Sequence, residues 1–168
     1  MIQPYILSGV SFYSVWYWIL TVVLWALICQ RPLGVPYDMI LRADRLPEVA
    51  DRVDFLAHIQ AERLNGLRET VGGPAAALIG FGLAMLAVLG FGFGVEVAQA
   101  GFALTFPMAM VAVATLALAA RARREGARGA DLRRLLARRR FWNQVICVLT
   151  ILAATLLALT HRPDMFPR

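Results

Sequence analysis

Residues 75–120 form one apolar stretch that contains a single charged residue, Glu96. One straight helix of this length would extend about 69 Å at 1.5 Å per residue, roughly twice the ~30 Å hydrocarbon thickness of a bilayer. The stretch must therefore fold back on itself. The glycine-rich segment at residues 90–96 is the natural hinge, and it predicts two spanning helices, at residues 75–92 and 98–119, with Glu96 at the membrane interface.

Two further apolar runs, residues 11–29 and 141–160, are each long enough to cross a bilayer. No basic residue precedes the first run and no small-residue cleavage site follows it, which predicts an uncleaved anchor. The chain is 60% hydrophobic, whereas soluble domains are about half apolar. We therefore predict an all-α polytopic protein with four transmembrane helices in a single membrane domain, residues 1–168.

Charge is distributed unevenly along the chain. All 17 basic residues are Arg, and 15 of them lie in residues 30–74 and 120–140, the two segments that connect spans on one side. By the positive-inside rule these segments are cytoplasmic, and both termini are periplasmic. The all-Arg usage is typical of a GC-rich bacterial genome, so the predicted location is the bacterial inner membrane. A basic patch for nucleic acid would be expected on a soluble domain with stacking aromatics, so no nucleic-acid partner is predicted.

The first cytoplasmic segment predicts an amphipathic helix over residues 46–69. Asp44 is expected to cap its start, with Pro47 in the first turn, and Gly72-Gly73-Pro74 is expected to end it. Its charges are balanced, which favours docking on a partner or on the protein's own helices over lying on anionic lipid. The predicted docking residues are Leu46, Val49, Val53, Leu56, Leu64 and Leu67.

Two sets of side chains are candidates for contact with lipid or with a partner. The run Arg138, Arg139 and Arg140 is first a determinant of topology, and contact with anionic lipid headgroups is compatible with that role. The first span is rich in aromatic residues, which are typical of membrane interfaces. The candidate partner or lipid contacts on it are Tyr13, Trp16, Tyr17, Trp18 and Trp25.

Small residues recur at four-residue spacing in the second span, at Ala76, Gly80 and Ala84. Such spacing lets helices approach closely. The seam is expected to pack the second span on the third or on another subunit.

Catalytic and metal-binding signatures are lacking in the sequence, so no enzyme activity and no cofactor other than a bound lipid is predicted. His58 and His161 fall on opposite sides of the membrane and cannot share a metal. Cys29 and Cys147 are interpreted as small hydrophobic residues. Glu96 is expected to cap a helix or to lie at the interface, with a proton or ligand role as the alternative.

Several segments carry a resemblance to a known group of proteins. They are Trp16-Tyr17-Trp18-Ile19, Leu33-Gly34-Val35-Pro36-Tyr37-Asp38-Met39, Val95-Glu96-Val97-Ala98-Gln99-Ala100 and Phe106-Pro107-Met108. On these segments the chain resembles a family of small, uncharacterised alphaproteobacterial inner-membrane proteins, sometimes labelled components of the SufBCD complex. The resemblance covers most of the chain and implies a membrane location, but it implies no functional residue.

These features predict a non-catalytic accessory or scaffold subunit of a larger inner-membrane complex, such as a respiratory or photosynthetic one. Its expected partners are membrane lipids and other integral-membrane subunits. Two alternatives are a small oligomeric transporter or channel, which would need a polar pore between copies, and an assembly factor for a membrane complex.

Overall fold

The computed structural model describes residues 12 and 14–160, and all regular structure in this part of the chain is helical, as predicted. In chain order the elements are α1 (Val15–Gln30), the 3-10 turn η1 (Pro32–Gly34), α2 (Tyr37–Ala43), α3 (Pro47–Ala87), the π-helical turn η2 (Val88–Gly92), α4 (Glu96–Glu125) and α5 (Gly129–Thr160).

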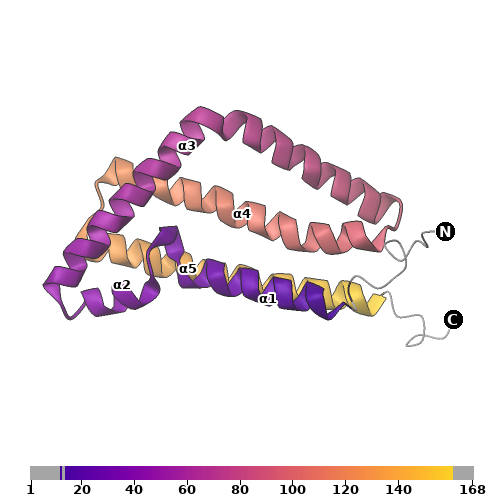
Figure 1. Ribbon diagram of the computed structural model, residues 1–168, viewed down its shortest axis with the longest axis horizontal. Coiled ribbons are helices and arrows are strands. Elements are labelled where there is room, and N and C mark those ends of the chain that lie inside the picture. Colours follow the sequence, from indigo (N-terminus) through magenta and orange to yellow (C-terminus); the bar gives the residue numbers. More distant parts are fainter. Residues whose placement is uncertain (1–11, 13, 161–168) are drawn as a thin grey trace.

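The long axis of the molecule is followed by α1, the second half of α3, α4 and α5 (Figure 1). At one end, α2 and the first half of α3 lie beside the α4–α5 connection. At the opposite end lie η2, the start of α1 and the end of α5. Both Arg-rich segments therefore gather at the same end, and the hairpin turn lies at the other.

Three helical segments are long and apolar enough to cross a membrane, namely Pro47–Gly92, Glu96–Glu125 and Gly129–Thr160. The apolar helix α1 has 16 residues, or about 24 Å at 1.5 Å per residue, which is shorter than the ~30 Å that a span needs. Residues 11 and 13 of the predicted first span lie outside the described residues. The fold thus supports a membrane-spanning protein with three long apolar helices.

The prediction that a helix ends at Gly72-Gly73-Pro74 is wrong, because α3 continues through these residues without a break. A proline inside a helix lacks its N–H and crowds the carbonyl four residues earlier, which bends the helix when its flanks favour helix. Here three alanines follow Pro74, and alanine is the best helix former. The result is a bend partway along α3 (Figure 1), so the predicted amphipathic helix and the second predicted span form one helix.

The predicted cap at Asp44 is also wrong. Leu46 is the residue that precedes the first turn of α3, and Pro47 occupies the first turn as predicted. The Asp44 carboxylate instead accepts a hydrogen bond from Nε of Arg133 on α5, over 2.9 Å. The Asp44 carboxylate therefore forms an ion pair with a helix distant in sequence and does not cap α3.

The second Arg-rich segment, residues 120–140, is almost entirely helical, because α4 and α5 extend past the predicted spans. Gly126 ends α4 in the left-handed conformation, with φ of 56°, which glycine adopts without steric cost. The backbone N–H of Gly129 donates to Oδ2 of Asp54 on α3, over 2.7 Å. The connection is thereby fixed to the first half of α3.

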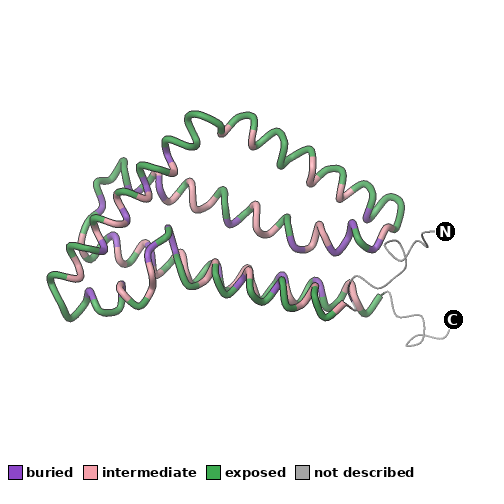
Figure 2. Tube along the Cα trace, viewed as in Figure 1, coloured by how far each residue is buried: buried purple, intermediate pink, exposed green. Residues whose placement is uncertain are grey.

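The main hydrophobic core lies at the Arg-rich end, in a region that we call the headpiece (residues 32–65 and 119–136). Outside the headpiece, the second half of α3 contains no buried residue and is mostly exposed (Figure 2). The buried residues of the headpiece core are Leu33, Val35, Ile40, Ala43, Val53, Ala57, Ala61, Ala119, Ala122, Ala127, Leu132 and Leu136.

Candidate functional site

The three consecutive arginines on α5 have three different environments, because successive residues of a helix are about 100° apart. Arg139 is half-buried and reaches across to α4. Its Nη2 donates to the carbonyl oxygen of Val111 over 2.6 Å, and it lies 3.4 Å from Oγ1 of Thr115. Arg139 therefore joins α4 to α5 within the protein.

Arg138 is exposed and lines a shallow cavity whose charges are mixed. In that cavity Arg121 pairs with Glu125 over 2.8 Å, and Asp131 also contributes a carboxylate. Any anion that approached Arg138 would meet these acids as well as the arginines.

Arg140 lies in a third environment, a cavity of about 380 Å³ between the end of α1, the start of α2 and α5. Its guanidinium carbon lies 3.5 Å from the centre of the Tyr37 ring, a favourable cation–π geometry. Its Nε is buried without a hydrogen-bond partner. Arg31, at the end of α1, lines the same cavity, so two arginines distant in sequence are brought together.

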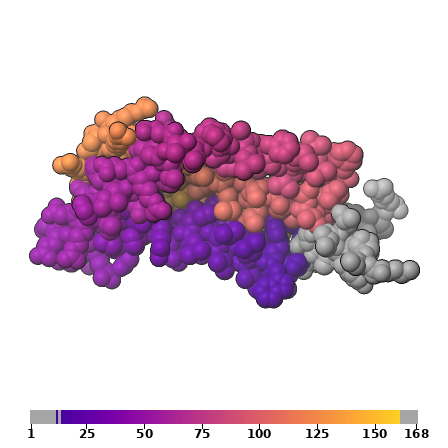
Figure 3. All heavy atoms as spheres, turned by 45° about the horizontal axis from the view of Figure 1, so that its top comes forward, coloured from indigo at the N-terminus to yellow at the C-terminus, as the bar shows by residue number. Residues whose placement is uncertain are grey.

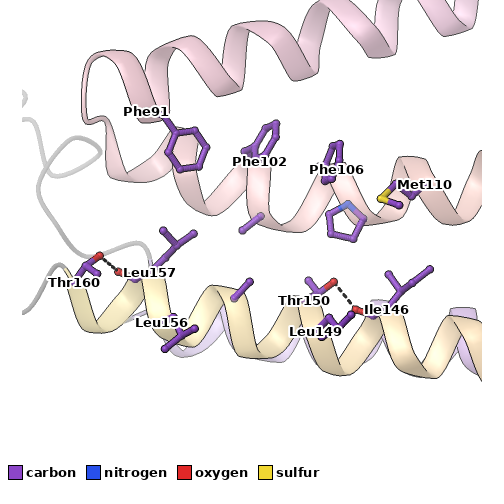
Figure 4. Close-up of a pocket in the computed structure, with 13 residues that line it drawn as sticks. Phe91, Phe102, Phe106, Met110, Ile146, Leu149, Thr150, Leu156, Leu157 and Thr160 are labelled. Atoms are coloured by element: carbon purple, nitrogen blue, oxygen red, sulfur yellow. Dashed lines mark hydrogen bonds between the residues drawn. The ribbon is translucent and has the colours of Figure 1, made fainter.

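An apolar groove of about 590 Å³ runs between α4 and α5. Phe91, Phe102 and Phe106 follow one another along one wall (Figure 4), and the rings of Phe102 and Phe106 are stacked with centres 5.2 Å apart. The hydroxyls of Thr150 and Thr160 on the other wall donate to carbonyls of their own helix. The groove thus presents hydrocarbon surface and no unused hydroxyl donor.

The hairpin turn holds two polar side chains in buried positions. Gln99 donates from Nε2 to the carbonyl oxygen of Gly90 over 2.7 Å. Glu96 is only 7% exposed, and its Oε1 accepts the backbone N–H of Phe12 over 3.1 Å. Glu96, the single charged residue of the apolar stretch at residues 75–120, therefore binds the backbone that leads into α1.

The aromatic residues predicted as one contact surface on α1 are divided by the structure. Trp16 is 77% exposed, whereas Trp25 is 2% exposed and belongs to the protein interior. Trp18 donates from Nε1 to the carbonyl oxygen of Phe12 over 2.8 Å, and Tyr17 packs edge-on against Trp18. Tyr13 lies outside the described residues. Of the described aromatic set, Trp16 is the residue most available to lipid or a partner.

The predicted docking residues are divided in the same way. Val53 is fully buried in the headpiece, whereas Leu46 and Leu67 remain about half exposed. The helix thus docks largely on the protein's own α2, α4 and α5. The remaining residues, partly buried against the headpiece core, are Val49, Leu56 and Leu64.

One pairing was missed by the sequence interpretation, which treated the two cysteines separately. The side chains of Cys29 on α1 and Cys147 on α5 lie close enough to interact with each other, and both are free. The signal in the sequence was their common position near the Arg-rich ends of two apolar runs. Among the residues that the structure describes, no group of three or more His, Cys, Asp or Glu side chains is placed to hold a metal ion.

Comparison of the chain with protein-family models, with curated proteins and with solved structures gave no match in any of the three.

Proposed function

We propose that the protein crosses the bacterial inner membrane four times, with the headpiece in the cytoplasm and both termini in the periplasm. The gathering of both Arg-rich segments at one end of the molecule supports this orientation. In this arrangement α1, with its 16 residues, is the fourth apolar segment that crosses the membrane.

We further propose that the protein is a non-catalytic accessory or scaffold subunit of a larger inner-membrane complex. The observation that carries this proposal is the poor packing of α3 within the membrane region. Of the 18 most apolar consecutive residues in α3 and the turn that follows it, only 6% are buried in the chain. The corresponding share is 22% in α4 and in α5. The surface of this helix is open along the molecule in Figure 3.

The small residues of this segment support the same proposal. A Cβ atom built on Gly80 or Gly82 would meet no atom within 4 Å, so neither glycine is needed for packing within the chain. Glycine in a helix interior costs about 1 kcal/mol relative to alanine. Residues two apart lie about 200° apart around a helix, so the two glycines open different sides of α3. Close approach of a helix from another subunit would compensate the cost on either side, so the exposed second half of α3 is the proposed partner surface.

In-membrane crosslinking tests this function. A photoreactive amino acid is placed at Leu78 or Phe81, which are 73% and 66% exposed on α3, and at Val148, which is 65% exposed on α5, as a control. The α3 positions are expected to crosslink to one integral-membrane protein that also co-purifies at fixed stoichiometry in mild detergent. The Val148 variant is expected to give lipid adducts only.

A chain that purifies alone and gives only lipid adducts from the α3 positions would contradict the proposal. Crosslinks between copies of this chain alone would instead indicate a homo-oligomer.

A further inference from the structure

The cavity around Arg140 combines features that suit an oxyanion. Its lining includes Arg31, Gln30, Tyr37 and Asp38. The single carboxylate among these residues, Asp38, already pairs with Arg42 over 2.9 Å. Among the described residues neither Arg31 nor Arg140 forms an ion pair, so the cavity carries two positive charges that no partner in this part of the chain neutralises.

The position of Arg140 is fixed before any ligand arrives. Its guanidinium is stacked on the Tyr37 ring at 3.5 Å, which restricts the planar fork of donors. Its Nε is buried without a hydrogen-bond partner, as is the Nε of Arg139, so a ligand in the cavity cannot reach either atom. Other atoms of Arg140 line the cavity, and phosphate oxygens match the guanidinium fork particularly well.

The position of the cavity at the ends of two apolar segments indicates the class of ligand. Arg31 directly follows the apolar helix α1, and Arg140 directly precedes the apolar run at residues 141–160. Both arginines therefore lie where two apolar segments emerge on the proposed cytoplasmic side. Phosphate groups of anionic lipids are concentrated at that level of a bilayer.

We propose that Arg140 and Arg31 form a binding site for a phosphate oxyanion, and that its occupant is the headgroup of an anionic phospholipid. The site singles out one arginine of the run, since Arg139 is bonded to the Val111 carbonyl and Arg138 lies among acids. It goes beyond the proposed scaffold role and rests only on the membrane location.

Native mass spectrometry of the purified full-length chain in mild detergent tests the site. The chain is titrated with phosphatidylglycerol and, separately, with phosphatidylcholine. Arg140→Gln is expected to weaken phosphatidylglycerol binding about tenfold, as loss of a charge-assisted hydrogen bond would. Arg138→Gln, which removes the same charge two residues away, is the matched control and is expected to change binding less than threefold.

Two further variants keep the test independent of folding. Arg31→Gln changes an exposed side chain and is expected to weaken the same binding severalfold in a protein that elutes as the wild type does. Arg140→Lys keeps the charge but loses the planar fork, and it is expected to bind less tightly than wild type.

Equal losses in Arg138→Gln and Arg140→Gln would overturn the site, because they would indicate attraction by net charge alone. Equal binding of phosphatidylcholine would also overturn it. Displacement of the lipid by millimolar inorganic phosphate would assign the cavity to a soluble phosphate and overturn the lipid assignment. All these measurements use the isolated chain, so a failure here would leave the accessory-subunit proposal untouched.

Discussion

Gln99 donates a hydrogen bond from its Nε2 to the carbonyl oxygen of Gly90, 2.7 Å away, and thereby joins the first turn of α4 to the end of the preceding helix. The two segments are so close that a Cβ atom on Gly90 would lie 2.9 Å from both Cγ and the backbone N of Gln99. The hairpin thus requires glycine at this position for space.

Gly90→Ala is therefore expected to destabilise the protein by about 1–3 kcal/mol, the usual cost of overpacking. Thermal unfolding in mild detergent, followed by circular dichroism, measures the change. Gly82→Ala is the matched control, because its Cβ would meet nothing within 4 Å and alanine favours helix. A Gly90→Ala protein as stable as Gly82→Ala would show that the close approach is not present.

Oxidation is expected to link Cys29 to Cys147 within one chain. These are the two cysteines of the sequence, and their side chains lie close enough to interact. Treatment of membranes with diamide, which takes up the two electrons and two protons released, should abolish alkylation of both thiols together. Mass spectrometry should then find a peptide pair from α1 and α5 joined by a disulfide.

The control for this crosslink is Cys29→Ser, which should leave Cys147 open to alkylation after the same treatment. Disulfide-linked dimers in place of the internal link would show that α1 and α5 do not pack as described.

Arg139→Ala is expected to lower the free energy of unfolding by about 1–3 kcal/mol, because it removes a charge-assisted hydrogen bond to a partly buried carbonyl. Arg138→Ala removes a neighbouring exposed side chain and is expected to stay within about 0.5 kcal/mol of wild type. The same detergent unfolding assay compares the two. A larger effect at Arg138 would reverse the assignment of the inward-facing arginine.

Glu96→Ala is expected to destabilise the hairpin end by about 1 kcal/mol, since it removes the acceptor of the Phe12 N–H. Glu96→Gln retains an oxygen that can accept this bond and is expected to be nearly neutral. Hydrogen exchange of the Phe12 amide, read in the purified protein, should accelerate in the alanine variant only. Proton or ion flux in proteoliposomes that is lost in Glu96→Gln would instead support a transporter.

The features predictable from the sequence were those set by length and hydropathy. The charge-poor stretch at 75–120 had to fold back, and the structure turns at residues 88–95 as expected. The continuation of α3 past Pro74 was not predictable from the residue type alone, because a proline either ends or bends a helix depending on the residues that flank it. Here the alanines after Pro74 decided the outcome.

Long-range pairings were the other features that local patterns did not reveal. Asp44 had a plausible local role as a cap, and only the packing of α5 shows that Arg133 takes its carboxylate. Similarly, Arg138 to Arg140 read as one basic run, but helix geometry separates them into an ion-pair surface, an interhelical bond and a cavity. These outcomes depend on which helices pack against each other, and the amino-acid sequence does not show this directly.

The unbroken course of α3 has a mechanical consequence. Its first half is clamped in the headpiece, where Val53 is fully buried and Asp54 holds the start of α5, whereas its second half is loosely packed in the apolar region. The far end of the helix is tied again at the turn, where Gln99 is bonded to the Gly90 carbonyl. The helix is therefore held at both ends with few buried residues between them, like a beam on two supports, so a displacement of the headpiece would be carried along α3 to the turn.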